Sequence, residues 1–251
     1  MFDQETQKRM AAEVAAEYVE DGNIVGLGTG STVKYVIEAL GRKVSEGLNI
    51  KALASSVQTE ELAKSFNIPL VTLSDVMQIY NGIDIAIDGA DQVDKSYNII
   101  KGGGGALHRE KIVMICASLK IIVVDHSKMV KKLDGCILPV EVTPFSHPYA
   151  TEFLAELGLP SLLRLDAQDQ PFVTDNGNYI LDCQLHKSFD LGKIMTLIPM
   201  MPGAVDHGLF VGLADLVIVG GPKGVKTHEV PKDDMPSEED IEKFLMRQLA
   251  Q

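Results

Sequence analysis

Short apolar segments alternate with amphipathic segments along the first half of the chain. The apolar segments have the length of strands and are followed by loops that carry glycine, and they cover 23–27, 51–55, 69–73, 83–88 and 120–125. The segments between them repeat apolar residues at helical spacing, and the helices that they predict cover 4–20, 33–40, 58–66 and 106–118. In the first of these helices Met10, Val14, Ala15, Tyr18 and Val19 lie on roughly one face. Strands that alternate with helices indicate an α/β fold, with a Rossmann-like, mostly parallel sheet and helices on both faces.

The pattern changes after about residue 133 and then returns. The next predicted strands and helices are 137–142, 147–157, 179–184, 189–197 and 204–210, with short segments at 162–166 and 171–174 beside turns. Asn176-Gly177 is typical of a hairpin turn, and the β-α-β-β-α-β order is that of a small α+β, ferredoxin-like domain. Because 214–221 again has the composition of a buried parallel strand, we expect the small domain (135–207) to be inserted into a discontinuous Rossmann-like domain (1–134 and 208–251).

The C-terminal segment predicts one more helix, over 237–250. Ser237 is a favourable N-cap residue and acidic residues follow it in the first turn. An apolar stripe that includes Ile241 and Leu245 is expected to pack on the same domain or on a second subunit. The sequence assigns this helix no function.

Composition and charge narrow the class of protein. The chain has 251 residues, 23 Lys and Arg against 35 Asp and Glu, and a net charge of −12 without a basic run, which argues against a nucleic-acid partner. No window approaches the length and apolar character of a membrane span, and the N-terminus lacks the apolar stretch of a signal peptide. The three cysteines form no C-x-x-C pair, so we expect a reducing, cytoplasmic location without disulfides or zinc.

The segment Lys101–Lys111 carries the strongest chemical signal. Four consecutive glycines follow Lys101, and Glu110 lies in the first turn of the helix that follows them. A lysine and the N–H groups at a helix start can stabilise an anion or an oxygen that becomes anionic during a reaction. A carboxylate one turn away can move a proton. The segment therefore predicts an active site, and a flexible surface turn is the alternative.

A second glycine-rich loop, at 26–32, follows a predicted strand and opens a helix. Its amides and the hydroxyls of Thr29, Ser31 and Thr32 are suited to hold a phosphate group. A dinucleotide fingerprint that begins at Gly26 would require glycine at position 31, where the chain has serine. A single phosphoryl group is the better match, with a plain strand-to-helix turn as the alternative.

Two carboxylates, Asp88 and Asp91, follow the apolar strand at 83–88. They are suited to accept hydrogen bonds from sugar hydroxyls and to shuttle hydroxyl protons, whereas Asp94 is expected to be solvated. No His or third acid joins them at ligand spacing, so no metal site is predicted. Ligands of open α/β sheets bind at the carboxyl ends of the strands, and the loops expected to meet there are 28–32, 55–59, 88–91 and 101–105.

These motifs together resemble the A-type ribose-5-phosphate isomerases. The matching segments, in the family's order and spacing, are 26–32, 55–63, 88–94, 101–111, 138–142, 173–178 and 224–227, and the resemblance covers about residues 5–230. It implies cofactor-free interconversion of ribose 5-phosphate and ribulose 5-phosphate through an enediolate, in the non-oxidative pentose phosphate pathway. A homodimer or homotetramer is the expected assembly.

The resemblance also implies roles for individual residues. Glu110 is expected to carry the proton between the first two carbons, and Asp88 and Asp91 to bind hydroxyls and help to open the sugar ring. Lys101 is expected to stabilise the enediolate oxygen, and Lys128 to close over the substrate. The remaining residues that are expected to contact the substrate are Thr29, Gly30, Ser31, Thr32, Gly89, Ala90, Gly102, Gly103 and Gly104.

Two further positions, Lys8 and His108, lie outside the catalytic and phosphate-binding assignments. Lys8 is a candidate for a second phosphate contact, with a solvated helix lysine as the alternative. His108 is expected to face outward and is assigned no role.

Two other classes of function remain as alternatives. An aminosugar-phosphate deaminase shares a similar phosphate loop, and release of ammonia from an aminosugar phosphate would identify it. A sugar-phosphate sensor would normally carry a DNA-binding unit, which neither the start of this acidic chain nor its charge supports.

Overall fold

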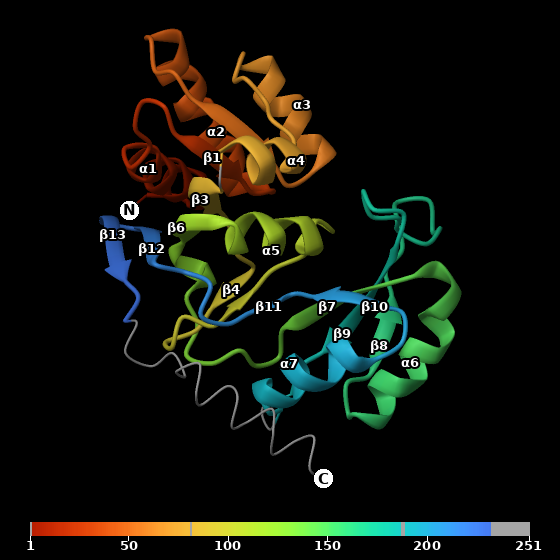
Figure 1. The fold of residues 1–251 in the computed structure, drawn as a ribbon. Coiled ribbons are helices and arrows are strands. Elements are labelled where there is room, and N and C mark those ends of the chain that lie inside the picture. The colour runs from red at the N-terminus through yellow and green to blue at the C-terminus, as the bar shows by residue number, and fades with distance from the viewer. Residues whose placement is uncertain (1, 81, 187–188, 232–251) are drawn as a thin grey trace.

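The computed structural model describes residues 2–80, 82–186 and 189–231, and its centre is a six-stranded sheet (Figure 1). The strand order is β13-β12-β6-β3-β1-β2. The strands of this sheet are β1 (Ile24–Leu27), β2 (Lys51–Ala54), β3 (Ile83–Asp88), β6 (Ala117–Asp125), β12 (Leu216–Gly221) and β13 (Gly224–Glu229). All neighbours are parallel except β13, which pairs with β12 in antiparallel fashion. The predicted mostly parallel α/β sheet is therefore confirmed.

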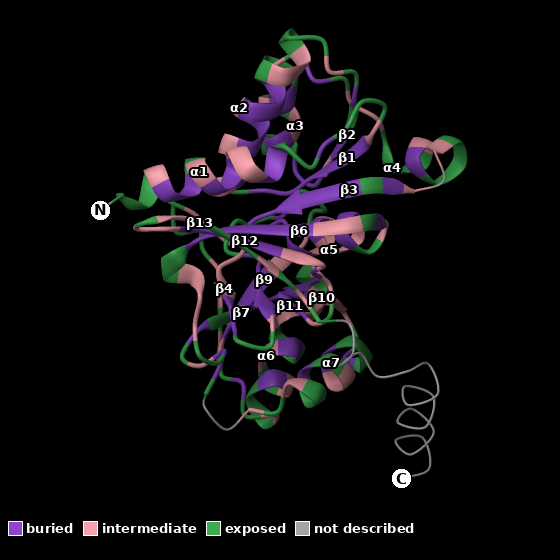
Figure 2. Cartoon of the chain, turned by 90° about the vertical axis from the view of Figure 1, so that its left-hand side faces the viewer, coloured by how far each residue is buried: buried purple, intermediate pink, exposed green. Residues whose placement is uncertain are grey.

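Helices cover both faces of this sheet. On one face lie α1 (Gln4–Ala16), α2 (Ser31–Ser45) and α3 (Val57–Ser65). On the other face α5 (Leu107–Ile115) lies between the main sheet and the smaller sheet, as Figure 1 shows. Consecutive residues of β6 are buried on opposite faces of the sheet: Ile121 and Val123 belong to one core and Ile122 and Val124 to the other. Figure 2 accordingly draws most of this strand in purple.

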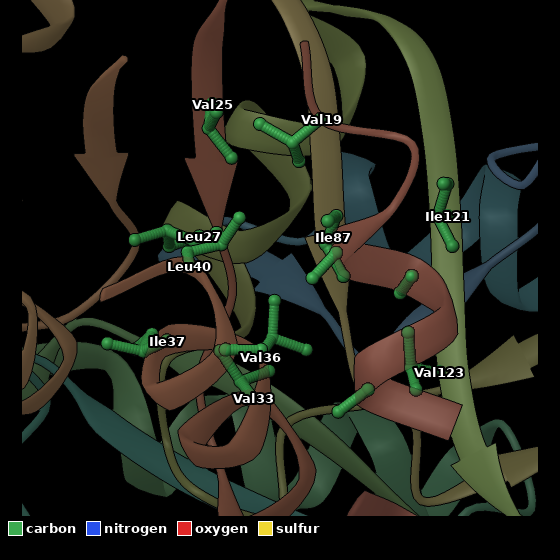
Figure 3. Packing of buried hydrophobic residues seen from close by; sticks show 14 of the residues in the cluster. Val19, Val25, Leu27, Val33, Val36, Ile37, Leu40, Ile87, Ile121 and Val123 are labelled. Atoms are coloured by element: carbon green, nitrogen blue, oxygen red, sulfur yellow. The ribbon is translucent and has the colours of Figure 1, made fainter. Parts of the chain in front are cut away.

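The packing under α2 shows how this burial fixes the helix. Its apolar positions Val33, Val36, Ile37 and Leu40 face Val25, Leu27 and Ile87 of the sheet, and all of these side chains are almost fully buried (Figure 3). Burying one such side chain stabilises the fold by roughly 1.5–3 kcal/mol. The i, i+3, i+4, i+7 spacing of one helix face therefore orients the start of α2, which lies at the carboxyl end of the sheet.

Helix α1 is shorter than the pattern predicted. It ends at Ala16 rather than near residue 20, and its buried face consists mainly of Ala11, Ala12, Ala15 and Ala16. Met10, Val14 and Tyr18 are only partly buried or exposed. Small alanines let the helix lie close to the strands, which is why the larger apolar residues do not define its contact face.

The predicted strand at 69–73 is wrong. This segment makes a single bridge, from Leu70 to Ala52, and then turns into the short helix α4 (Leu73–Asp75) and a π-helical turn (Val76–Tyr80). The side chain of Thr72 accepts a hydrogen bond from the Asp75 N–H, and the Asp75 side chain accepts one from the Thr72 N–H. This capping box starts a helix where hydrophobicity alone favoured a strand.

A four-stranded antiparallel sheet forms the small domain. Its strand order is β10-β7-β9-β8, a ferredoxin-like arrangement, and its strands are β7 (Ile137–Val142), β8 (Ser161–Leu163), β9 (Tyr179–Gln184) and β10 (Ala204–His207). The helices α6 (His147–Glu156) and α7 (Leu191–Met200) pack against it around a separate core. Short 3₁₀ turns lie at His126–Lys128 and Pro144–Ser146.

The predicted strand at 204–210 divides between two sheets. Residues 204–207 form β10, whereas β11 (Leu209–Phe210) joins β5 (Ile99–Ile100) and β4 (Gln92–Val93) in a three-stranded sheet. This third sheet links the two larger ones and carries the chain into the Lys101 loop. The helix predicted at 237–250 lies outside the described residues. Among the described residues no helix is both long and apolar enough to span a membrane.

Candidate active site

A polar cleft of about 100 Å³ lies where the loops after β1, β3, β5 and β6 meet. Its lining residues are Thr29, Gly30, Ser31, Thr32, Gly89, Ala90, Asp91, Lys101, Gly102, Gly103, Gly104, Glu110 and Lys128. The catalytic and substrate-binding residues predicted from the sequence line this cleft, apart from Asp88, which is buried and ion-paired with Lys101. The loop at 55–59 was expected to meet the other three loops here, but none of its residues lines the cleft. Wider hollows, of about 580 and 630 Å³, lie over β8 and between α2 and α3, but none of the ionisable residues of the cleft lines them.

Lys101 forms the electrostatic centre of the cleft. Its side chain is almost completely buried, and Nζ lies 2.9 Å from Asp88 Oδ1 and 3.3 Å from Glu110 Oε1. It also donates to the carbonyl of Gly89 at 2.7 Å. Burial lowers the pKa of Lys101, but the Asp88 and Glu110 carboxylates outweigh that effect and keep the pKa above its usual value. The ammonium group therefore stays charged.

Asp88 ends β3 directly beneath the phosphate loop. Its Oδ1 accepts hydrogen bonds from the N–H groups of Thr29, at 3.2 Å, and Gly89, at 2.7 Å. A Cβ atom on Gly28 would lie 1.9 Å from this carboxylate, so only glycine lets β1 and β3 approach here. Burial raises the pKa of Asp88, and Lys101 opposes the rise.

Glu110 lies in the first turn of α5, with its carboxylate turned inward. Its side chain is 5% exposed, although glutamate at this position of a helix usually faces water. Burial raises the pKa of Glu110 to about 8; the ammonium of Lys101 opposes the rise and the charge of Asp88 adds to it. The carboxylates of Asp88 and Glu110 share the one ammonium of Lys101.

Two carboxylate oxygens in this cluster lack a hydrogen-bond partner among the described residues. They are Asp88 Oδ2 and Glu110 Oε2, and both are buried. A buried acceptor without a partner costs about 1–3 kcal/mol, and such groups are concentrated at functional sites. Both oxygens belong to carboxylates that flank Lys101, and each is left free to form a hydrogen bond with a bound molecule.

The loop at 28–32 has the geometry of an anion site, although one hydroxyl differs from the expectation. Gly30 has φ 110° and forms the N-cap of α2, so Ser31 and Thr32 stand at the positive end of a 15-residue helix. Thr29 instead turns its hydroxyl inward, where it lies 2.9 Å from Ser55 Oγ and 2.8 Å from Ser56 Oγ. Thr29 therefore fixes the loop from below, and its hydroxyl does not face the cleft.

Asp91 and the glycine loop contact each other directly. The N–H of Gly103 donates to Asp91 Oδ2 at 2.8 Å, and a Cβ on Gly103 would lie 2.8 Å from the other carboxylate oxygen. Gly102 has φ 101°, a conformation that side chains other than glycine rarely adopt. These constraints explain the glycines at 102 and 103.

The remaining candidates differ in their placement. Lys128 follows β6 and lines the cleft. Lys8 pairs with Glu5 at 2.8 Å and does not line the cleft. Asp94 is buried rather than solvated, because its carboxylate accepts from Ser96 and Asn98 and shapes the turn between β4 and β5. His108 is partly exposed, with Nδ1 3.4 Å from Asp206.

The sequence did not identify the groups that support the cleft from outside its motifs. Arg164, just after β8, reaches the carbonyls of Gly102 and Gly103. The Ser55-Ser56 pair was recognised only as part of a loop, and its link to Thr29 depends on the adjacency of β1 and β2. Among the described residues no group of three or more His, Cys, Asp or Glu side chains is arranged to hold a metal.

Comparisons with known proteins agree on one family. The family model described as ribose 5-phosphate isomerase A (phosphoriboisomerase A) matches residues 51–224. The ribose-5-phosphate isomerase A of Desulfatibacillum aliphaticivorans is 44% identical, and the match covers 90% of this chain and 98% of the relative. That of Bacillus mycoides is 41% identical, and the match covers 88% of this chain and 98% of the relative.

Solved structures agree with the sequence comparisons. The ribose 5-phosphate isomerase A of Methanocaldococcus jannaschii superposes with a TM-score of 0.84 at 38% identity, covering 90% of this chain and 99% of its own. A D-ribose-5-phosphate isomerase in complex with phospho-erythronic acid superposes with a TM-score of 0.86 at 38% identity. The match covers 91% of this chain and 100% of that protein.

Proposed function

The chain belongs to the ribose 5-phosphate isomerase A family, and from this premise we propose how its cleft interconverts ribose 5-phosphate and ribulose 5-phosphate. The protein is an aldose-ketose isomerase of the pentose phosphate pathway. The reaction moves one proton between C2 and C1 of the open-chain sugar and another between the two oxygens. It therefore requires a base, a stabiliser for the anionic intermediate and a site for the phosphate.

Glu110 is the base in this proposal. Its carboxylate removes the proton from C2, the C2–H electron pair forms the C1=C2 double bond, and the carbonyl π pair moves onto O1. Return of the proton to C1, together with transfer of the O2 hydroxyl proton to O1, gives the ketose. The observation that carries the assignment is the buried, unpartnered Glu110 Oε2 beside Lys101.

Lys101 and the glycine amides stabilise the enediolate oxygen. A fixed ammonium group in a site that excludes water acts on developing charge far more strongly than in bulk water. Asp88, whose Oδ2 is free of hydrogen bonds from the described residues, exchanges a proton with the anomeric hydroxyl and helps to open the ring. Asp91 holds Gly103 and accepts from a second sugar hydroxyl.

The phosphate binds at the start of α2. The amides of Gly30, Ser31 and Thr32 and the two hydroxyls contact its oxygens, and Lys128 lies on the lining of the same cleft and adds a positive charge. The resulting catalyst uses no metal and no cofactor.

One assay tests this function as a whole. The purified protein should form ketose from ribose 5-phosphate at the same rate with and without EDTA. Absence of ketose, release of ammonia from an aminosugar phosphate, or a loss of activity on chelation that a divalent ion restores would each contradict the proposal.

The pH profile tests the state of Glu110. A base works only when it is deprotonated, and burial raises the pKa of Glu110 to about 8, so kcat/KM should rise with pH through this value and then level off. The substrate phosphate titrates at about pH 6, so it adds a separate rise of kcat/KM at lower pH. A profile that stays flat between about pH 7 and about pH 9 would exclude Glu110 as the titrating base.

The phosphate site can be tested without touching the reacting carbons. Replacing Ser31 and Thr32 together by alanine should raise KM for ribose 5-phosphate about a hundredfold, because hydrogen bonds to a charged group contribute roughly 1.5–3 kcal/mol each. Turnover should change little, since the phosphate does not react. Ser45→Ala, at the opposite end of α2, is the matched control and should leave KM unchanged.

The same variants separate binding from scaffolding. Unphosphorylated ribose should be a very poor substrate, and the double substitution should barely alter that residual rate. Equal losses on ribose and on ribose 5-phosphate would place the phosphate elsewhere.

Three further assignments accompany this function. We assign residues 1–134 and 208–251 to the catalytic domain and 135–207 to the small domain, in agreement with the boundaries of the two larger sheets. The widely spaced free thiols Cys116, Cys136 and Cys183 favour a cytoplasmic location. Exposed apolar side chains on the small sheet, among them Leu162, favour a homodimer or homotetramer.

A further inference from the structure

Arg164 extends from the small domain to the glycine loop of the cleft. Its Nη1 donates to the carbonyl of Gly102 at 2.9 Å and to that of Gly103 at 3.1 Å. The other side of the guanidinium is held by Asp182 on β9, with Nε 2.9 Å from Oδ2 and Nη2 2.5 Å from Oδ1. Its side chain is only 14% exposed. A bidentate pair of this kind fixes the plane of the guanidinium and hence the direction of Nη1.

The two carbonyl contacts determine where the loop's N–H groups point. In a planar trans peptide the carbonyl oxygen and the N–H point in opposite directions. The Gly102–Gly103 peptide is held at both ends, because Arg164 binds its oxygen and Asp91 binds its N–H. In the Gly103–Gly104 peptide Arg164 again binds the oxygen. The Gly104 N–H must then point away from Arg164, and no acceptor for it is found in the described part of the chain.

The glycine loop has few restraints of its own. Residues without a Cβ have the widest range of backbone conformations, and the loop makes one turn hydrogen bond, from the N–H of Gly105 to the carbonyl of Gly102 at 3.0 Å. The cleft side of the loop is left for the substrate, and the restraint comes from the opposite side. Arg164 adds to this turn a side-chain donor that meets two successive carbonyls and so restrains both peptides together.

Contacts elsewhere already hold the small domain against the main sheet. Arg109 donates to the carbonyl of Asp175 and to the side chain of Asn176, both at 2.7 Å, and Asp175 accepts from the N–H of Val57 at 2.8 Å. None of these contacts reaches the glycine carbonyls. Arg164 is therefore one of several contacts that join the domains, and it is the one of these that reaches the glycine carbonyls.

We propose that Arg164 is a positioning residue for the isomerisation, which aims the Gly104 N–H at the enediolate oxygen. The proposal rests on the proposed function of the glycine loop. Arg164 contacts no reacting atom and acts only through the two peptides. The small domain thereby supplies a part of the transition-state stabilisation that the main sheet cannot supply alone.

Arg164→Met tests this role in the full-length protein. Losing one donor of an oxyanion site costs about 10²–10³-fold in turnover, and misdirecting one should cost roughly ten- to a hundredfold. We expect kcat to fall by this amount while KM for ribose 5-phosphate stays within about threefold. Inhibition by phospho-erythronic acid, whose carboxylate carries charge like the enediolate, should weaken in parallel. Inhibition by inorganic phosphate should not change.

Arg109→Met is the matched control, because it removes a separate arginine bridge between the domains. It should lower the melting temperature and leave kcat close to that of the wild type. Equal losses of kcat in the two variants, or an unchanged kcat in Arg164→Met, would overturn the proposal. If Arg164→Met does not fold, Asp182→Asn provides the test, because Asp182 holds the guanidinium of Arg164. A severalfold lower kcat at constant KM would support the positioning role of Arg164, and an unchanged kcat would exclude it.

The test also separates this inference from the function itself. A wild-type protein that makes no ketose would refute the proposed function. A wild-type protein that makes ketose beside a fully active Arg164→Met variant would refute only the positioning role.

Discussion

Glu110→Gln should reduce turnover of ribose 5-phosphate by about 10²–10⁴-fold, the range that a general base contributes. The amide keeps the size of the side chain and can still accept a hydrogen bond from Lys101, but it cannot take a proton from carbon. KM and the affinity for phospho-erythronic acid should stay nearly constant, because the phosphate and hydroxyl contacts remain. Steady-state kinetics of the purified variant, with substrate in excess, measure both effects.

The control for this substitution is a second buried glutamate outside the cleft. Glu141 is fully buried, and its Oε1 accepts hydrogen bonds from Thr174, Asn176 and Asn178. Glu141→Gln should lower the melting temperature and leave kcat within about threefold. If Glu110→Gln keeps more than about a tenth of wild-type turnover, the base lies elsewhere, because no typical general base contributes so little.

Lys101→Met should lower kcat by about 10²–10³-fold, the cost of removing a fixed donor from an oxyanion site. The substitution also leaves Asp88 and Glu110 buried without their shared counter-ion. Removing one partner of a buried ion pair costs about 3–5 kcal/mol, so the variant should be clearly less stable to urea. Part of this loss should be recovered at low pH, where the carboxyl groups take up protons.

Lys111→Met separates the two effects of the Lys101 substitution. Lys111 is largely buried and pairs with Asp206, but it does not line the cleft. Its loss should destabilise the protein comparably and change kcat by no more than about threefold. If both lysine variants lose turnover in proportion to their loss of stability, Lys101 has only a structural role.

The sequence predicted the central strands because hydrophobicity and turn residues agree there. The predicted limits of β3, β7 and β9 match the structure, since each is an apolar run bounded by residues that end strands. Strands of two residues, such as β4 and β5, are too short to have a detectable period. β5 pairs with β11, which lies more than 100 residues further along the chain, and β4 pairs with β5.

The cleft was predictable to the extent that its residues lie in short local motifs. Glycine loops and carboxylates that follow strands indicate their position from sequence spacing alone. Two features depend on distant parts of the chain. The inward rotation of the Thr29 hydroxyl follows from Ser55 and Ser56 on the neighbouring strand's loop, and the contact of Arg164 follows from the docking of a separate sheet. Neither leaves a periodic or compositional signal.

The insertion of the small domain also affects how the chain reaches its native state. In the main sheet β6 pairs directly with β12, although residues 126–215 separate them in the sequence. Within the insertion the first and last strands, β7 and β10, pair with each other, so Val140 lies opposite His207. Once the small sheet has formed, the ends of the insertion are already close together. Bringing β6 and β12 together then requires little further loss of chain entropy. We therefore expect β6 and β12 to pair more readily after the small sheet has formed, because a distant parallel pairing is slow when its loop must close without such help.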